Sequence, residues 1–499
     1  GEPSRGVLEI VNSGSSITHT GGTITLLSDN NYGSAPTIAS LFLEPATSNL
    51  SGSNIVINLS NNDRDFSINS TVALNKITLQ STSGSGSETV ELQTRPLTIN
   101  GDLLVQNDIE FQTNNLNLTL LGDFILTGTA SYTSGTNTTT FTVANSQTNL
   151  LSGSSTVSFF NFKKNGLGTL DLGGNIAVNG AELNLLAGSL NDAGFLITFT
   201  GQQFTNNGTH TSPSNSNTTG VLFSGSSQQI LKTDGNAVFG NLMIDNGNGV
   251  ALPDVSQEFR INRRLVLDNG VIDIGPALFV FSATGEIVGD AASEGVYGSE
   301  FANFSETNQI QTNSSIIDFG VEKEFNASTT TDFTFPVGEE TRYTPAKISF
   351  STAVSGTSGS TSGSVRIRPR NSVAPIMLSE SQVVQDAILQ YYWLVNSSDL
   401  TGFEADLIFN YDDEVIGTDP ESSYSGALAF FADTDNGVSE GIGTVNTTAN
   451  TITFPINMPI SVPADSLTND ENFSGEYFAG DPSTIPDELI RPIDTAKQK

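Results

Sequence analysis

The chain has no cysteine, and only two histidines and one tryptophan occur among its 499 residues. The absence of cysteine excludes disulfide bonds, thiolate metal sites and cysteine nucleophiles. The two histidines, His19 and His210, lie far apart in threonine-rich segments, and we expect both at the surface. Histidine is the commonest general base near neutral pH, and nothing in the sequence sets a serine beside either one. The sequence therefore gives no sign of a serine-type catalytic triad.

Positive charge is also scarce. The 19 Lys and Arg residues stand against 53 Asp and Glu residues, which gives a formal net charge of −34. A surface this acidic repels nucleic acids and anionic membranes, so we expect neither as a partner. Apolar runs stay well below the ~20 residues of a transmembrane helix, and residues 1–20 lack the charged and apolar regions of a signal peptide. We expect no membrane insertion and no bound cofactor, except for calcium as discussed below.

Charged residues make up only 14% of the chain, and Asn, Ser, Thr and Gly supply most of its polar character. Thr, Val, Ile and Phe suit strands, and Asn and Gly suit turns, whereas long soluble helices usually need charged helix formers. Composition therefore predicts an all-β protein.

One pattern recurs at a spacing of about 80 residues, and internal repetition of this kind is typical of solenoid architectures. Segments 97–101, 176–180 and 259–263 share the form apolar-x-(Ile or Val)-Asn, with Ile99, Val178 and Ile261 at their central positions. Segments 159–162 and 239–242 form a second family with nearly the same offset. The two families together indicate one unit that recurs over roughly 70–290.

Short alternating strands, separated by turns such as Asn-Gly and Ser-Gly, fill each repeat. Alternation buries one face of a strand, and strands this short enclose a core only when successive coils stack. We predict a parallel β-solenoid (β-helix) over 71–350, with three or four coils in each repeat, after an N-terminal cap and first coils over 1–70. We interpret the recurring Asn100, Asn179 and Asn262 as turn residues, because Asn tolerates left-handed geometry and bonds the backbone.

The pattern changes after the solenoid. Residues 351–364 are almost entirely Ser, Gly and Thr and predict a flexible linker or loop. Strand-length segments separated by acidic, Gly-rich turns follow over 365–480 and predict an antiparallel β-sandwich. The Pro-containing tail, 481–499, is open between a linker, a disordered tail and an arm that docks on another subunit.

Three motifs resemble those of a known group of proteins. They are Thr-Asn-Asn-Gly-Thr at 205–209, Phe-Pro-Val-Gly at 335–338 with Tyr-Thr-Pro at 343–345, and Tyr-Tyr-Trp at 391–393. In this the chain is similar, over roughly residues 95–480, to the large surface and secreted proteins that Bacteroidota export by type IX secretion. The resemblance implies display, adhesion or gliding-type roles outside the cell rather than catalysis. The chain departs from the group's pattern because no secretion-signal domain follows residue 480.

Carboxylate chemistry is the main alternative. Parallel β-helices host polysaccharide lyases and hydrolases, which use paired acids or a metal with basic residues on one face. The candidate cluster here is Arg260, Arg263 and Arg264 with Asp268 and Asp273. Arg263 and Arg264 are adjacent, so on a strand their side chains point to opposite faces, and we expect the cluster to split.

Two acidic turns are candidate calcium sites, because calcium prefers hard oxygen ligands. One contains Asp433 and Asp435, and the other contains Asp412 and Asp413. In the first, Gly437 stands where a third ligand belongs, and no Glu occupies the twelfth position of an EF-hand loop. The alternative reading is a pair of ordinary acidic hairpin turns.

Tyr391, Tyr392 and Trp393 fit either a sugar-stacking platform or the core, and we expect Trp393 to be a core anchor. The sequence as a whole predicts a non-catalytic structural or adhesive protein of the bacterial surface, whose partners are surface glycans, other proteins or further copies of itself. Polymerisation into filaments is a variant of this hypothesis. The competing hypothesis is a polysaccharide-active β-helix enzyme.

Overall fold

The computed structural model describes residues 7–11, 14–28, 39–59, 66–82, 88–145, 147–253, 257–289, 304–313, 318–339, 342–357, 362–378, 387–417, 421–430, 438–458 and 473–484. The chain divides into two compact units, Gly1–Met243 and Ile244–Lys499. Most regular structure is β-strand, as composition predicts, and the α-helix α1 spans only Pro375–Leu378. Within the described ranges, no helix is long and apolar enough to cross a membrane.

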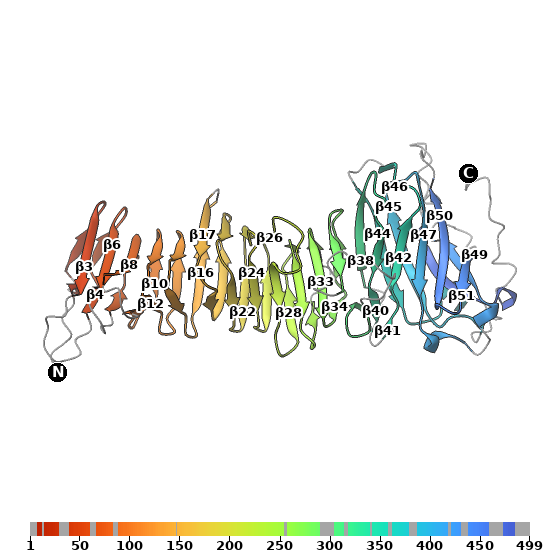
Figure 1. The fold of residues 1–499 in the computed structure, drawn as a ribbon, viewed down its shortest axis with the longest axis horizontal. Helices are drawn as coiled ribbons and strands as arrows, with labels where there is room; N and C mark the ends of the chain where they lie inside the picture. Colours follow the sequence, from red (N-terminus) through yellow and green to blue (C-terminus); the bar gives the residue numbers. More distant parts are fainter. Residues whose placement is uncertain are drawn as a thin grey trace. The chain divides into compact units, whose positions relative to one another are not determined.

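Unit 1 is a parallel β-solenoid with three sides, and most of its described coils contribute one strand to each side (Figure 1). The first sheet contains β3 (Thr23–Ser28), β6 (Asn54–Leu59), β8 (Lys76–Ser81), β11 (Leu103–Val105), β14 (Phe124–Leu126), β17 (Thr148–Ser152), β20 (Thr169–Leu172), β23 (Ser189–Asn191), β26 (Thr209–Thr211) and β29 (Asn236–Phe239). The second contains β10 (Leu97–Ile99), β13 (Leu118–Leu120), β16 (Thr138–Thr142), β19 (Asn161–Asn165), β22 (Glu182–Leu185), β25 (Gln203–Asn206) and β28 (Gln229–Lys232).

The third side of unit 1 is built from two successive sheets. The earlier one contains β1 (Leu8–Ile10), β4 (Ala39–Leu43), β7 (Phe66–Ser70), β9 (Glu88–Leu92), β12 (Ile109–Gln112) and β15 (Ser131–Thr133). The later one contains β18 (Val157–Phe159), β21 (Ile176–Val178), β24 (Leu196–Phe199) and β27 (Gly220–Phe223), and β30 (Leu242–Asp245) follows at the unit boundary. Near the N-terminus, β2 (Ser16–Thr18) pairs with β5 (Thr47–Asn49).

The core consists of in-register columns of inward side chains. In the second sheet, one column runs Leu97, Leu118, Thr139, Phe162, Leu183, Phe204 and Leu231, and every member is buried. Neighbouring strands alternate buried and half-exposed positions, so the apolar residues of each strand meet those of the next coil. The predicted solenoid is confirmed.

The repeating unit of this solenoid is a coil of about 21 residues, which is the separation across which side chains bond the main chain of the next coil. Ile99 and Val178, which match in the longer sequence repeat, lie on β10 and β21, and these strands belong to different sheets. The strands on all three sides share the same alternation and corner chemistry. Two segments with matching sequences are therefore both strands, but the match does not show that they lie on the same side of the coil.

Unit 2 begins with further coils of the same kind. Three series of successive parallel strands form these coils. The first is β31 (Val250–Ala251), β34 (Ile272–Gly275), β37 (Ile310–Thr312) and β40 (Val337–Glu339). The second is β32 (Glu258–Ile261), β35 (Leu278–Phe281) and β38 (Gly320–Asn326), and the third is β33 (Arg264–Asn269) and β36 (Glu286–Val288).

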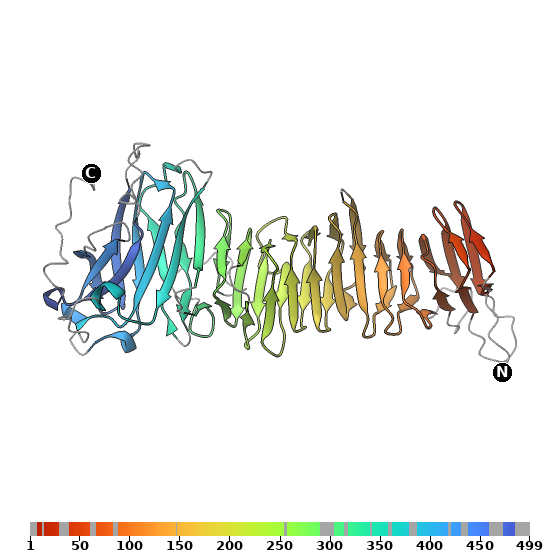
Figure 2. The same ribbon diagram turned by 180° about the vertical axis from the view of Figure 1, so that it is seen from behind.

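The rest of unit 2 is an antiparallel β-sandwich, seen from both sides in Figures 1 and 2. One sheet has the order β38, β44 (Ser362–Arg370), β45 (Tyr392–Ser398), β51 (Gly475–Gly480), β48 (Ser425–Phe430) and β49 (Val438–Asn446). The other has the order β39 (Phe333–Phe335), β42 (Ala346–Phe350), β47 (Phe403–Asn410), β50 (Thr451–Met458) and β49. Minor elements are β41 (Arg342–Tyr343), β43 (Gly356–Thr357), β46 (Leu400–Thr401), η2 (Asp413–Val415), η3 (Glu421–Ser423) and η5 (Pro482–Thr484).

Within unit 2 the change from solenoid to sandwich falls on one strand. β38 pairs in parallel with β35 and antiparallel with β44, so sandwich pairing begins near Gly320, well before the expected start at residue 365. Ser362–Ser364 of the expected linker belong to β44, where they pair with β38. A Ser- and Gly-rich segment forms a strand here because its neighbours supply the hydrogen-bonding ladder, a tertiary effect that composition does not report.

At the N-terminal end, the described residues between 7 and 59 form coil strands β1 to β6, and no separate capping element occurs among them. Leu8 and Ile10 are half-buried, whereas their partners in the next coil, Leu41 and Leu43, are fully buried. At the other end of the chain, η5 is the last described element, and residues 485–499 lie outside the described residues.

Candidate functional site

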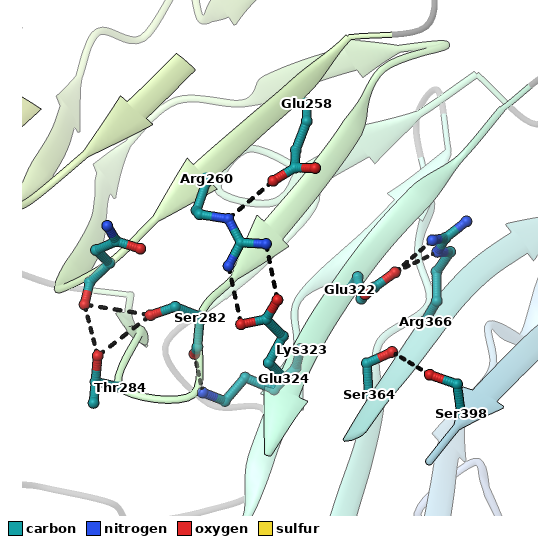
Figure 3. A network of polar contacts seen from close by, with 11 residues as sticks. Glu258, Arg260, Ser282, Thr284, Glu322, Lys323, Glu324, Ser364, Arg366 and Ser398 are labelled. Carbon is teal, nitrogen blue, oxygen red and sulfur yellow. Dashed lines mark hydrogen bonds and ion pairs between the residues drawn. The ribbon is translucent and has the colours of Figure 1, made fainter. Parts of the chain in front are cut away.

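The strongest polar network of unit 2 lies where the last coils meet the sandwich (Figure 3). Arg260 on β32 donates a hydrogen bond to Glu258 of its own strand at 2.9 Å. It also donates to both carboxylate oxygens of Glu324 on β38, at 2.9 and 2.8 Å. Hydrogen bonding by Glu324 raises the pKa of Arg260 further above its ordinary value. On the same strand, Glu322 pairs with Arg366 of β44. The charges on β38 therefore link it to a solenoid strand on one side and a sandwich strand on the other.

Lys323 lies between these two glutamates in the sequence, and its side chain points the opposite way, into the interior. Its ammonium group donates to the main-chain oxygens of Ser282, Ala283 and Gly285, at 2.6, 3.0 and 3.0 Å. Burial lowers the pKa of Lys323 to about 8. Every donor of this side chain is directed at the turn that follows β35, so the group holds a turn and is not free to act on a ligand.

Lys164 in unit 1 repeats this arrangement. Its side chain is completely buried, and its ammonium group donates to the main-chain oxygens of Asn165, Gly166 and Ala187, at 3.3, 2.8 and 2.9 Å. Burial lowers its pKa to about 8 as well. Neither lysine was predicted from the sequence to be buried. For Lys164 the signal was its position, two residues after Phe162 on the inward side of β19.

His210 is completely buried, so the expectation of a surface position was wrong. Its Nε2 lies 3.2 Å from an oxygen of the buried Asp192, and its Nδ1 accepts a hydrogen bond from the Gly240 N–H at 3.3 Å. Leu190 precedes it in the same inward column, which places this imidazole in the core. The other histidine, His19, is half-buried.

Ser212 completes the cluster without forming a catalytic triad. Its hydroxyl bonds Asp192 and accepts from the Asn241 N–H at 2.8 Å. Ser212 and His210 thus share the same carboxylate, whereas a serine nucleophile needs the imidazole between itself and the acid. The cluster ties successive coils together in the core.

The basic cluster proposed from the sequence is divided among three sheets. Arg260 lies on β32, Arg264 on β33 and Asp273 on β34, and these strands belong to different sheets. Arg264 pairs with Glu286, and Asp273 accepts from the Gly275 N–H. Arg263 lies between β32 and β33, and Asp268 lies on β33. The structure therefore does not bring these side chains to one point.

Of the two acidic turns, the one with Asp412 and Asp413 lies within the described residues. Asp433 and Asp435 lie outside the described residues. Asp412 accepts from the Glu414 N–H at 3.0 Å as the cap of η2, and Asp413 accepts from the Asn450 side chain at 2.5 Å. No group of three His, Asp or Glu side chains arranged to hold a metal occurs in the described ranges. Calcium binding at either turn stays a prediction.

The aromatic run at 391–393 lies in the sandwich core. Tyr391 and Trp393 are fully buried, and Tyr392 is 5% exposed. Trp393 stacks on Phe409 with ring centroids 4.8 Å apart, and its indole N–H donates to the Thr344 carbonyl at 3.0 Å. The expectation that Trp393 anchors the core is confirmed, and this run offers no flat aromatic surface to a sugar.

The recurring asparagines are corner residues, as expected, but they lack the left-handed backbone that was part of the expectation. Asn100, Asn179 and Asn262 are absent from the described non-glycine residues with positive φ. Asn179 instead accepts from the Thr200 hydroxyl of the next coil, at 3.2 Å, and the glycine that follows it, Gly180, passes so close to the Phe160 carbonyl that a Cβ atom would lie 2.4 Å from it. The Asn179–Gly180 corner therefore depends on close approach between coils and on a side-chain hydrogen bond rather than on left-handed backbone.

Comparison with protein-family models, curated proteins and solved structures gave no match for this chain.

Proposed function

We propose that this protein is a non-catalytic structural or adhesive protein outside the bacterial cell, exported in the manner of the type IX substrates that its motifs resemble. One observation carries the proposal. Five side chains of types that often take part in catalysis are bonded instead to neighbouring coils, turns or strands in the described part. They are His210, Asp192, Lys164, Lys323 and Arg260.

The use of charge supports the same reading. Buried ammonium and imidazole groups contact main-chain atoms or a neighbouring coil, so they stabilise the scaffold and present nothing to a substrate. A protein built to display or to bridge needs a long stable scaffold more than it needs a reactive pocket. Its partners under this proposal are surface glycans, other proteins or further copies of the chain.

The competing proposal is a polysaccharide-active enzyme, which needs a pair of free carboxylates converging on a sugar. Glu258 and Glu324 both accept hydrogen bonds from Arg260, so both carboxylates are engaged by that guanidinium. No observation in the described part favours this alternative over the structural one.

Binding and turnover measured on the same ligands distinguish the two proposals. The full chain is applied to an array of bacterial and host glycans, and each bound glycan is recovered and tested for new reducing ends and for unsaturated uronate absorbance. Retention of unchanged glycan supports an adhesive role. Fibres with a constant axial repeat in electron microscopy, without glycan binding, support the structural variant. Cleaved products, absent with heat-denatured chain, would overturn the proposal in favour of the enzyme.

A further inference from the structure

Asn165 and Gly166 form an exposed corner at the end of β19. The Gly166 N–H donates to the side-chain oxygen of Asn165 at 2.9 Å, so the glycine nitrogen points at the amide of the residue before it. Asn165 is exposed, and the residue after the glycine, Leu167, is 67% exposed. Water and hydroxide therefore have access to this corner.

This contact sets the geometry for a reaction within the chain. When a base removes the proton from the Gly166 nitrogen, the electron pair left behind occupies the direction of the former N–H bond, toward the Asn165 side chain. Attack of that nitrogen on Asn165 Cγ closes a succinimide ring, and a geometry that holds the reacting groups together in advance lowers the barrier. Glycine has no Cβ atom that would shield the nitrogen.

The surroundings of the corner favour loss of that proton. The Asn165 carbonyl shares a peptide bond with the Gly166 nitrogen, and it accepts from the buried Lys164 ammonium at 3.3 Å and from the Val143 N–H at 3.0 Å. Deprotonation spreads negative charge over this nitrogen and this carbonyl oxygen. Donors that are already in place stabilise such a charge as it develops.

Two other Asn-Gly corners, Asn100–Gly101 and Asn179–Gly180, have a different geometry. The glycine N–H of the first donates to the Asn75 carbonyl at 2.6 Å, and that of the second donates to the Phe160 carbonyl at 2.7 Å. Both nitrogens therefore point at the preceding coil rather than at their own asparagine. Both asparagines are exposed, as Asn165 is, so access to water does not distinguish the three corners.

We propose that Asn165 is a site of self-modification, at which the folded chain converts its own asparagine into aspartate and isoaspartate. In the first step the Gly166 nitrogen loses its proton to hydroxide and bonds to Asn165 Cγ, while the bond from Cγ to the side-chain nitrogen breaks and ammonia leaves. In the second step water adds to one carbonyl of the succinimide and opens the ring. No oxidation or reduction takes place, and water and hydroxide are the only co-reactants.

The two products change the corner in different ways. Aspartate places a carboxylate near the Lys164 ammonium and keeps the length of the main chain. Isoaspartate adds a methylene to the main chain, where the oxygens of Asn165 and Gly166 bind Lys164 and where a Cβ atom on Gly166 would already lie 2.2 Å from the Val143 carbonyl. Isoaspartate should therefore loosen this corner. The inference does not depend on the proposed function, because the reaction needs only the chain and water.

The test is peptide mapping of the full folded chain after incubation at neutral pH and body temperature. Brief digestion with chymotrypsin is suitable, whereas a protease specific for lysine would cut directly before Asn165. Each conversion adds about 1 Da, and electron-transfer fragmentation distinguishes isoaspartate from aspartate. We expect conversion at Asn165 to be at least about tenfold faster than at Asn100 or Asn179.

The same chain unfolded in guanidinium chloride should convert the three asparagines at similar rates, because each is followed by glycine and only the fold distinguishes them. Asn165→Gln should abolish the fast conversion, since glutamine would have to close a larger ring, and Asn179→Gln is its matched control. Circular dichroism establishes that both variants fold, and the wild-type map is decisive without them.

Conversion at Asn100 or Asn179 that matches or exceeds conversion at Asn165 in the folded chain would overturn the inference. A preference for Asn165 that persists unchanged in guanidinium chloride would overturn it too, because local sequence rather than the geometry of the corner would then be the cause.

Discussion

The indole N–H of Trp393 donates to the main-chain oxygen of Thr344 at 3.0 Å, and this bond joins two sequence motifs that lie far apart in the chain. The hydroxyl of the same threonine bonds the Tyr391 hydroxyl at 2.6 Å. Thr344 thus contacts both inward aromatic residues of the 391–393 run, and all three groups are buried. Through these two hydrogen bonds, Thr344 of the Tyr-Thr-Pro element at 343–345 fixes Tyr391 and Trp393 in the sandwich core; we call this pair of bonds the Thr344 lock.

Removing this lock should destabilise unit 2. Tyr391→Phe leaves the Thr344 hydroxyl without its partner and should lower the free energy of unfolding by about 1–2 kcal/mol. Tyr392→Phe is the matched control, because it removes a hydroxyl from the neighbouring position and keeps the Thr344 contact. Chemical unfolding monitored by Trp393 fluorescence measures both. Equal losses in the two variants would argue against the lock.

The two neighbouring lysines of β19 should differ sharply. Lys164→Met leaves three main-chain oxygens without their buried donor and should cost about 1–3 kcal/mol of stability. Lys163→Met changes an outward, half-exposed position and should stay within about 0.5 kcal/mol. Thermal unfolding of the full chain, followed by circular dichroism, compares the two. A Lys163 variant as damaged as the Lys164 variant would contradict the structural role assigned here.

The buried lysines also predict a dependence on pH. The folded-state pKa values of Lys164 and Lys323 are lowered from 10.5 to about 8. Between these values the unfolded chain binds more protons than the folded chain, so the free energy of unfolding should rise as the pH rises from 8 toward 10. Below pH 8 both states are protonated and the effect disappears.

The measurement is chemical unfolding at half-unit steps from pH 7 to 9.5. That window stops short of the region in which the buried tyrosines, whose pKa values are raised, would act in the opposite direction. A double variant, Lys164→Met with Lys323→Met, should flatten the rise. A wild-type stability that falls across this range would refute the assignment.

Corner glycines should tolerate substitution according to how closely the coils approach. A Cβ atom on Gly122 would lie 2.2 Å from the main chain of Gly101, whereas a Cβ atom on Gly235 would meet nothing within 4 Å. Gly122→Ala should therefore cost about 2 kcal/mol or more, and Gly235→Ala should be nearly neutral. Neither position has positive φ, so backbone strain does not confuse the comparison. Thermal unfolding provides the readout, and similar losses at both positions would contradict the close-approach explanation.

Local pattern was enough to predict the fold class. Alternation along each strand and turn residues between strands specify which side chains point inward, and stacking follows because no single coil can close a core. The same pattern could not assign the matched segments to one side of the coil, since Ile99 and Val178 look alike on different sheets. The start of the sandwich was also hidden, because the strand that begins it, β38, alternates as a solenoid strand does.

Individual polar residues were harder to predict for a different reason. Lys164 and His210 are ordinary surface residues by type, and they are buried only because carbonyl groups or a carboxylate from the neighbouring coil satisfy them. Ala187, which contacts Lys164, and Asp192, which contacts His210, are about a coil away in the sequence but adjacent in space. A single sequence does not reveal the pairing, although the inward position of Lys164 on its strand was readable in advance.

The coil has one more consequence, for how such a chain can change length over evolution. Most bonds between described coils join a coil to the one before it or the one after it, and many of these contacts span 21 residues. The sequence separation between paired residues of successive coils is larger from Phe204 to Leu231, yet these two residues remain in register. Extra residues can thus be absorbed at a corner while the columns stay aligned. Duplication or deletion of a whole coil would leave the remaining neighbours with compatible partners, so the number of coils in such a protein can change among its descendants while the sandwich stays intact.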